Sequence, residues 1–278
     1  MPQGPSVERW LQAFRQAVEE QKLIFSQHPT IESRTAYEGV GEGGDNTLVI
    51  DRLCEDTVFA QLEALAAEGH AFIAVSEERG TVEFGESPAT RVVIDPIDGS
   101  VNARRMIPSH SLSIAVASGD SMAEVELGYV YEFGKGEEFV GVSGQGVRVD
   151  GVEVTTPEGD GMELVAMEAG KPSRVIPMAE ALDGHAYRIR SPGSIAISLS
   201  YVAAGRYDGM LTTRPCRSVD AAAAQLIARE AGASVAFEGL ELSGAPLDLE
   251  RRYQLAGART EGDLEILRRA QAAIENPN

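Results

Sequence analysis

Two aspartates and a serine occur within one short stretch, Asp95-Pro96-Ile97-Asp98-Gly99-Ser100. Three of the four preceding residues, 91–94, are apolar and β-branched, which predicts a buried strand that ends at Asp95. Pro96 should end that strand, and Asp98-Gly99 is a turn dipeptide in which glycine can adopt a positive φ. Two carboxylates and a backbone carbonyl would then face one small space, which is the ligand set that Mg²⁺ prefers. Taken alone, Asp-Pro and Asp-Gly pairs are also ordinary surface turns.

Further acids occur where they could join this stretch. Glu77 and Glu78 follow an apolar strand predicted for residues 72–76, so two neighbouring strands could pool their ligands at one end. The alternative is that both glutamates are exposed loop acids. Asp220 begins an alanine-rich helix, where it could equally be an N-cap or a first-turn acid that interacts with the helix dipole.

Two earlier segments are open to more than one interpretation. Asp51 and Glu55 share a face near the start of a predicted helix, which by itself indicates a solvated acidic first turn. Residues 39–46 are rich in glycine and acidic, so they form either a surface loop or a flap that closes over a site.

Composition limits the classes of function. A length of 278 residues with 43% hydrophobic residues supports either one large layered domain or two halves. The net charge of −19 argues against nucleic acid or an anionic membrane as partner, and an anionic substrate would need local cations or a metal. We find neither a membrane-spanning run nor a signal peptide. Cys54 and Cys216 have no CxxC spacing, which indicates reduced core thiols in the cytoplasm, and the four histidines show no zinc pattern.

The predicted elements change character at residues 155–160, a polar segment that contains glycine and proline. Before it we expect helices over 6–25 (with Ser6 as N-cap) and 48–67, and antiparallel strands over 111–117, 125–131 and 138–142. Residues 147–154 should form a hairpin around the turn dipeptide Asp150-Gly151. After it we expect strands over 164–167, 186–190, 209–212, 234–237 and 253–258, and helices over 174–182, 194–204, 220–231 and after 260. This alternation indicates an α/β protein in which helices cover a sheet. We therefore predict an N-terminal α+β half with the metal site (1–155) and a C-terminal α/β half that completes the substrate site (156–278).

Taken together, the motifs resemble those of the inositol monophosphatase family, the Mg²⁺-dependent, lithium-sensitive sugar phosphatases. The matching motifs are Glu77-Glu78, Asp95 to Ser100, Ser218-Val219-Asp220-Ala221-Ala222-Ala223, Gly193-Ser194 and residues 201–209. The resemblance covers nearly the whole chain from about residue 35. In detail the chain is most similar to the archaeal-type branch, whose members often act on both inositol 1-phosphate and fructose 1,6-bisphosphate. The shared details are Asn102-Ala103-Arg104, Gly128-Tyr129-Val130-Tyr131 and Arg214-Pro215.

The resemblance implies an alternating α-β-α-β-α sandwich and a role for each matching residue. The metal ligands would be Glu77, Asp95, the Ile97 carbonyl, Asp98 and Asp220. Asp51 and Ser100 would align and deprotonate a metal-bound water, with Glu77 also in the catalytic set. The substrate-binding set would include Asp98, Gly99, Ser100, Gly193 and Ser194, with the Gly99 and Ser100 amides on the phosphate. We add Arg174, Arg190 and Arg214 to this set, from a group of cations in the second half of the chain that could bind a remote second phosphate or could equally be solvated surface charges: Lys171, Arg174, Arg188, Arg190, Arg214 and Arg217. The cofactor would be about two or three Mg²⁺ ions, which Mn²⁺ could replace.

The family resemblance also implies a small phosphorylated sugar or polyol as substrate and a homodimer in the cytoplasm. Three departures from the family pattern bear on this. Ser100 stands where the family usually has threonine, which keeps the hydroxyl. In the family's mobile loop, Val40 and Gly43 stand where family members have a lysine or an aspartate, and Glu42 or Asp45 could take over the role of that charged residue. Thr213 stands where animal enzymes have a glutamate that contacts inositol, which weakens a dedicated inositol function. The alternatives are a nucleotide 3′-phosphatase of the same superfamily and a catalytically silent, phosphatase-like binding protein.

Overall fold

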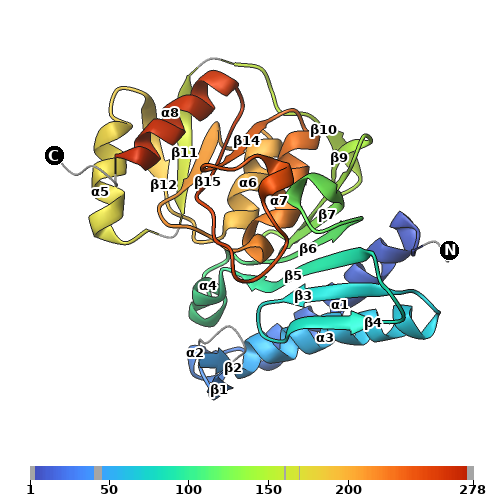
Figure 1. Cartoon of the computed structure of the whole chain (residues 1–278). Helices are drawn as coiled ribbons and strands as arrows, with labels where there is room; N and C mark the ends of the chain where they lie inside the picture. The colour runs from blue at the N-terminus through green and yellow to red at the C-terminus, as the bar shows by residue number, and fades with distance from the viewer. Residues whose placement is uncertain (1–3, 41–45, 160, 169, 274–278) are drawn as a thin grey trace.

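The computed structural model describes residues 4–40, 46–159, 161–168 and 170–273 (Figure 1). The helices of this part of the chain are α1 (Val7–Gln27), α2 (Ile31–Arg34), α3 (Val49–Ala67), α4 (Ser100–Arg105), α5 (Pro172–Ala181), α6 (Ile195–Ala203), α7 (Ser218–Glu230) and α8 (Glu261–Ala272). The strands are β1 (Tyr37–Val40), β2 (Asn46–Leu48), β3 (Phe72–Ser76), β4 (Gly80–Phe84), β5 (Thr90–Asp98), β6 (Ser111–Ala117), β7 (Val125–Glu132), β8 (Glu137–Val142), β9 (Gly146–Val149), β10 (Val152–Val154), β11 (Met162–Glu168), β12 (Ala186–Arg190), β13 (Gly209–Thr212), β14 (Ser234–Phe237) and β15 (Leu255–Ala258).

The elements stack in five layers, which confirms the predicted α-β-α-β-α sandwich (Figure 1). Helices α1 and α3 cover one face of an eight-stranded sheet, and α6 and α7 lie between its other face and a five-stranded sheet. Helices α5 and α8 cover the outer face of the second sheet. Alternation within the strands separates the layers: Ala74 belongs to the outer core with α1 and α3, whereas Val75 belongs to the central core with α6 and α7.

The eight-stranded sheet has the order β10-β9-β8-β7-β6-β5-β3-β4. Strands β3 and β5 are parallel neighbours, with Ser76 opposite Ile94, so Glu77 and Asp95 follow at the same end. Our prediction that Pro96 ends the strand was wrong, because β5 continues to Asp98 through an irregularity in its pairing with β6. Asp95 pairs with Ser113 and Asp98 pairs with Ser111, so β5 has one residue more than β6 between these two pairs, which is a β-bulge. Proline has no N–H to donate to the ladder, and a bulge accommodates it.

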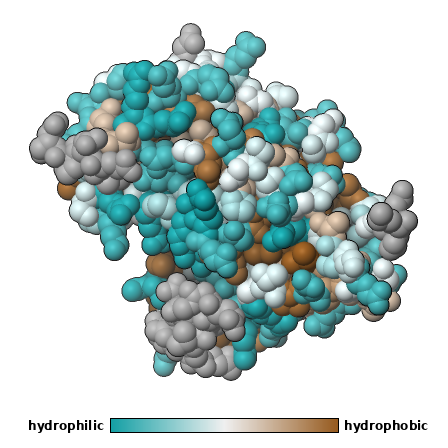
Figure 2. All heavy atoms as spheres, viewed as in Figure 1, coloured by the Kyte–Doolittle hydropathy of each residue, from teal (hydrophilic) through white to brown (hydrophobic). Residues whose placement is uncertain are grey.

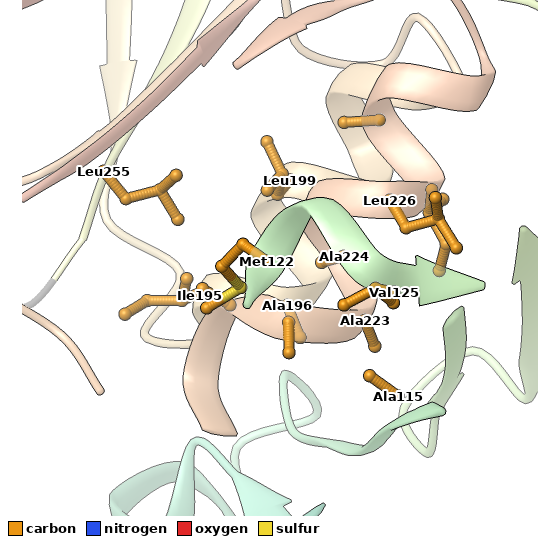
Figure 3. Close-up of a cluster of buried hydrophobic side chains, with 14 of the residues drawn as sticks. Ala115, Met122, Val125, Ile195, Ala196, Leu199, Ala223, Ala224, Leu226 and Leu255 are labelled. Atoms are coloured by element: carbon orange, nitrogen blue, oxygen red, sulfur yellow. The ribbon is translucent and has the colours of Figure 1, made fainter. Parts of the chain in front are cut away.

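Helix α7 lies close to the first sheet because both surfaces carry small residues. A Cβ atom on Gly128 of β7 would lie 2.4 Å from the carbonyl oxygen of Ala223, so only glycine fits there. Figure 3 shows Ala223 and Ala224 of α7 in the central core with Ala115 and Val125 of the sheet. This packing fixes the N-terminus of α7, and with it Asp220. The predicted start was wrong: α7 begins at Ser218 with Arg217 as N-cap, so Asp220 is a first-turn acid and not the cap.

Other predictions had mixed outcomes. Ser6 caps α1, and the Asp150-Gly151 turn joins β9 to β10 with both residues at positive φ, as expected. The prediction that the acids of the first turn of α3 are solvated was wrong, because Asp51 and Glu55 are both buried. Elements α2, α4 and β4 were not predicted. Residues 41–45, with Glu42, Gly43 and Asp45 of the suggested flap, lie outside the described residues.

The division into domains 1–155 and 156–278 stays a prediction. The two larger sheets do come from residues on either side of 155–161, but α7 of the second half packs against strands of the first half. The face in Figure 2 is mainly hydrophilic. Among the described residues, no helix is long and apolar enough to cross a membrane.

Candidate active site

A cavity of about 770 Å³ opens where the ends of β3, β5 and β11 meet the N-termini of α4, α6 and α7. Residues from both halves of the chain line it: Glu77, Asp95, Ile97, Asp98, Gly99, Ser100, Val101, Asn102, Glu168, Gly170, Ser191, Gly193, Ile195, Arg214, Pro215, Cys216, Arg217, Asp220 and Arg252. The cavity therefore brings together every residue that we predicted to hold metal, together with Gly99, Ser100, Gly193 and Arg214 of the substrate set.

Asp95 is the most enclosed of these acids, with 2% of its surface exposed. Its Oδ1 accepts a hydrogen bond from the Ile97 N–H at 3.0 Å, which turns the bulge inwards. Burial raises the pKa of the Asp95 carboxyl well above its usual range, and the charges of Glu77, Asp98 and Asp220 raise this pKa further. All four of these acids line the same cavity.

Asp98 is held by the N-terminus of α6. Its Oδ2 accepts hydrogen bonds from the Ser194 hydroxyl at 2.5 Å and from the Ala196 N–H at 2.7 Å. Burial raises the pKa of Asp98 to about 7, although the bond from Ser194 acts in the opposite direction. Ser194 also caps α6 by accepting from the Ile197 N–H at 3.2 Å. Ser194 therefore positions Asp98 without lining the cavity. The other oxygen of Asp98, Oδ1, accepts a longer hydrogen bond from the Ile195 N–H at 3.4 Å and is its candidate ligand atom.

Arg217 connects the acids that come from β3 and α7. Its Nη2 contacts Oε1 of Glu77, and its backbone N–H donates to Oδ2 of Asp220 at 2.7 Å. Burial raises the pKa of Glu77 to about 7; Arg217 lowers this pKa and Asp220 raises it. The Arg217 guanidinium is thus a cation among carboxylates that repel one another.

The chemistry of these donors fits a hard divalent cation. Buried carboxylates and the Ile97 carbonyl line one cavity, and such oxygen ligands suit Mg²⁺. Among the described residues, no three His, Cys, Asp or Glu side chains lie near enough to one another to hold a metal ion as they stand. Two of the acids are engaged elsewhere, because Glu77 is paired with Arg217 and Asp98 with α6.

Gly99 turns the chain from β5 into α4. It has φ of 89°, as the sequence predicted, and a Cβ atom there would lie 2.9 Å from the Ser109 carbonyl oxygen. This turn makes Ser100 the first residue of α4, where it lines the cavity beside the acids. The first turn of α4 consequently lines the same cavity as the candidate metal ligands.

Asp51 and Glu55 lie on the buried side of α3. Asp51 is not among the residues that line the cavity, and its relay with Ser100 stays a prediction. Glu55 has no exposed surface, and it accepts hydrogen bonds from the Ser76 hydroxyl and from the N–H groups of Glu78 and Arg79 at 3.3 and 3.2 Å. It therefore fixes the turn that carries Glu77.

The predicted arginines separate into two groups. Arg214 lines the cavity, whereas Arg174 and Arg190 do not. Nη1 of Arg174 donates to the carbonyl oxygen of Thr213 at 3.1 Å, and Nη1 of Arg190 donates to the carbonyl of its neighbour Ile189 at 2.9 Å. The substrate roles of all three stay predictions.

Sequence reasoning gave no role to Asn102, Glu168 or Arg252, which also line the cavity. Nδ2 of Asn102 donates to the carbonyls of Ser109 and Pro192 at 2.7 and 2.6 Å, which ties α4 to the segment before α6. Glu168 is fully buried and accepts from the Ser198 hydroxyl at 2.5 Å and the Gly193 N–H at 2.9 Å. The signal for Glu168 was present, because it follows a run of apolar residues in the sequence, as Glu77 and Asp95 do. Nothing in the local sequence marked Arg252.

The same fold occurs in solved structures of phosphatases. A crystal structure of an inositol monophosphatase-fructose 1,6 bisphosphatase superposes with a TM-score of 0.79 and 25% identity, and the match covers 94% of this chain and 99% of that one. A fructose-1,6-bisphosphatase/inositol-1-monophosphatase of Methanothermobacter thermautotrophicus is 30% identical over 247 residues, which are 85% of this chain and 86% of that protein. A fructose-1,6-bisphosphatase of Pyrococcus furiosus is 32% identical over 199 residues, 70% of this chain and 72% of that protein.

The fold and the cavity thus define a phosphoric monoester hydrolase. The model of the inositol monophosphatase family matches residues 8–275, and the chain belongs to that family. Family membership supports metal dependence in general and a phosphorylated sugar or polyol as the class of substrate.

Proposed function

We propose that this protein is a Mg²⁺-dependent phosphatase of small sugar or polyol phosphates, with fructose 1,6-bisphosphate and inositol 1-phosphate as candidate substrates. The observation that carries the proposal is the cavity in which Glu77, Asp95, Asp98 and Asp220 lie beside Ser100. Burial and the charges of Glu77, Asp98 and Asp220 raise the pKa of Asp95, so bound cations would favour its ionised form. The residues that would hold the cations are Glu77, Asp95, the Ile97 carbonyl, Asp98 and Asp220.

When bound, divalent cations lower the pKa of a coordinated water and neutralise charge that develops on the phosphoryl group. The residues of this chain orient the other reactants. The Gly99 and Ser100 amides, at the start of α4, would bind phosphate oxygens, and the lining of the cavity by both residues supports this role. The Ser100 hydroxyl would accept a proton from the attacking water while it donates its own proton to the Asp51 carboxylate. The oxygen of the water forms a bond to phosphorus as the bond between phosphorus and the ester oxygen breaks, and the sugar leaves as an alkoxide that takes a proton from solvent.

The mouth of the cavity supports a substrate with a second phosphate. Arg214 and Arg252 both line the cavity and are both exposed, in a protein whose overall charge is −19. Guanidinium groups bind phosphate through two parallel hydrogen bonds, so two of them at the mouth would offset the repulsion of a bisphosphate. Two relatives carry fructose-1,6-bisphosphatase in their names, which favours the same substrate here.

A phosphate-release assay with the purified protein tests the proposal. The panel is inositol 1-phosphate, fructose 1,6-bisphosphate and adenosine 3′,5′-bisphosphate, each with Mg²⁺, with Mn²⁺ and with EDTA. We expect release from the first two only when a divalent cation is present. Preferential release from the nucleotide would favour the 3′-phosphatase alternative, and no release from any ester would favour a silent binding protein.

We also propose that the protein acts in the cytoplasm as a homodimer. Both cysteines, Cys54 and Cys216, are free and buried, as expected for a chain that folds in a reducing compartment. Sedimentation equilibrium would establish the number of chains.

A further inference from the structure

Arg217 differs from the other arginines of the cavity in its surroundings. Arg214 and Arg252 are exposed, whereas the side chain of Arg217 retains only 14% of its accessible surface. Its guanidinium contacts Glu77 through Nη2, and its backbone N–H is bound to Asp220. Arg217 is therefore joined at both ends to residues that would hold the metal.

The positive charge of Arg217 offsets part of the repulsion between the carboxylates of the cavity. Carboxylates that share a buried site repel one another, and a cation is needed to keep them ionised. Arg217 meets this need only in part, because its buried Nε has no hydrogen-bond partner among the described residues. A guanidinium held by one acid, with a donor left unsatisfied, is more easily displaced than a fully bonded one.

Hydrogen bonds hold the backbone at Arg217. The N–H of the preceding residue, Cys216, donates to the carbonyl of Tyr253 at 2.7 Å, and the Tyr253 N–H donates back at 2.9 Å. The Arg217 N–H is itself fixed by Asp220. Its long side chain can nevertheless withdraw from Glu77 without any change in the backbone.

We propose that Arg217 is an internal counter-ion, which a divalent cation displaces from Glu77 when it binds. The inference rests on the proposed metal dependence and adds to it a residue that sets the affinity for the cation. A guanidinium and a divalent ion repel each other, so they cannot both occupy the carboxylate of Glu77 at low cost. After displacement, the guanidinium stays in the cavity and can face the anionic substrate.

The inference predicts two effects of opposite sign in Arg217→Gln. Removal of the competing charge should tighten binding of Mg²⁺ roughly tenfold. The cation-free protein should unfold at a lower temperature, because its acids lose their counter-ion. A residue that only supported the structure of the site would lower both affinity and stability.

The experiment is calorimetric titration of Mg²⁺, and separately of Mn²⁺, into protein stripped with EDTA, together with thermal unfolding in EDTA. Arg214→Gln is the matched control, since it removes the same charge from the same cavity. Unlike Arg217, the side chain of Arg214 forms no ion pair with any of the described residues. We expect that control to change the affinity by less than about threefold. Equal or weaker binding by Arg217→Gln, with binding by the wild type intact, would overturn the counter-ion role alone. Absence of binding by the wild type would overturn both proposals.

A second measurement uses the wild-type protein and so does not depend on the folding of the variant. In protein labelled with ¹⁵N-arginine, the Nε–H resonance of Arg217, assigned by its loss in Arg217→Lys, should shift or exchange faster when Mg²⁺ is added. A resonance that stays unchanged at saturating Mg²⁺ would show that the ion pair with Glu77 persists and would reject displacement.

Discussion

Asp95 is the acid on which the site depends most directly, because it interacts with each of the other three and is almost fully buried. Replacing it with asparagine keeps the size of the side chain and an oxygen for the Ile97 N–H, but it removes the charge of a proposed metal ligand. We expect Asp95→Asn to lower kcat by about three orders of magnitude at saturating Mg²⁺, as measured by phosphate release. The fold should persist, since one repulsive charge is lost.

The matched control for this substitution is Asp183→Asn, an exposed aspartate in the turn after α5, which should have wild-type activity. If Asp95→Asn retained more than about a tenth of the activity, the metal site would have to lie elsewhere.

Ser100 offers a sharper test of the proton relay, because its hydroxyl and its amide have different proposed roles. Ser100→Ala removes only the hydroxyl and should lower kcat by about 10²–10⁴-fold, while KM changes little because the phosphate is held by backbone amides. Ser100→Thr keeps the hydroxyl and should retain most of the activity. Steady-state kinetics on inositol 1-phosphate separates the two parameters, and an unchanged kcat in Ser100→Ala would reject the relay with Asp51.

At the scale of elements, the turn after β3 is held in place by α3. Glu55 has no exposed surface and accepts one hydroxyl and two amide donors from residues around Glu77. Glu55→Ala would leave these donors without their acceptor, which should lower the free energy of unfolding by about 1–3 kcal/mol in urea titrations. It should also weaken Mg²⁺ binding, because the backbone that carries Glu77 becomes free to move.

The control for Glu55 is Glu63→Ala, on an exposed position of the same helix, where the change should lie within about 0.5 kcal/mol. Equal stability of the two variants would show that the buried network contributes nothing to the turn.

The acids that could be predicted from the sequence share one local pattern: an apolar strand followed by a carboxylate. Glu77 and Asp95 fit it, and their meeting needed only the assumption that the two strands are neighbours, which the parallel pairing of β3 and β5 confirms. The burial of Asp51 and Glu55 could not be predicted, because it depends on which face of α3 the first sheet covers. The ion pair of Arg217 joins residues 140 positions apart, and no local pattern indicates such a contact.

At the scale of the whole molecule, the net charge of −19 repels an anionic substrate. We therefore expect the arginines near the cavity to decide whether a substrate with two phosphates can bind. We expect the double variant Arg214→Ala with Arg252→Ala to raise KM for fructose 1,6-bisphosphate by roughly tenfold or more, and to leave KM for inositol 1-phosphate nearly unchanged. The double variant Arg174→Ala with Arg190→Ala removes the same charge outside the cavity lining. A larger effect from that second pair would place the second phosphate beside Arg174 and Arg190, as the sequence first indicated.

The acids of the cavity should also make the stability of the whole protein depend on pH and on metal. Burial raises the pKa of both Glu77 and Asp98 to about 7, whereas in the unfolded chain such groups titrate near pH 4. Between about pH 4 and pH 7 the folded state therefore binds more protons than the unfolded state. This contribution to stability is fully present below the unfolded pKa and is lost as the pH rises through the folded pKa.

Without divalent cations, we therefore expect a lower Tm at pH 8 than at pH 5.5, as measured by calorimetry in EDTA. Saturating Mg²⁺ should raise the Tm more at pH 8 than at pH 5.5, since cations bind the ionised acids. General repulsion from the net charge would also lower the Tm at high pH, but it would act equally in any variant with one acid fewer. Asp95→Asn should flatten the dependence on pH and Asp183→Asn should not. The same slope in both variants would assign the effect to the overall charge and not to the cavity.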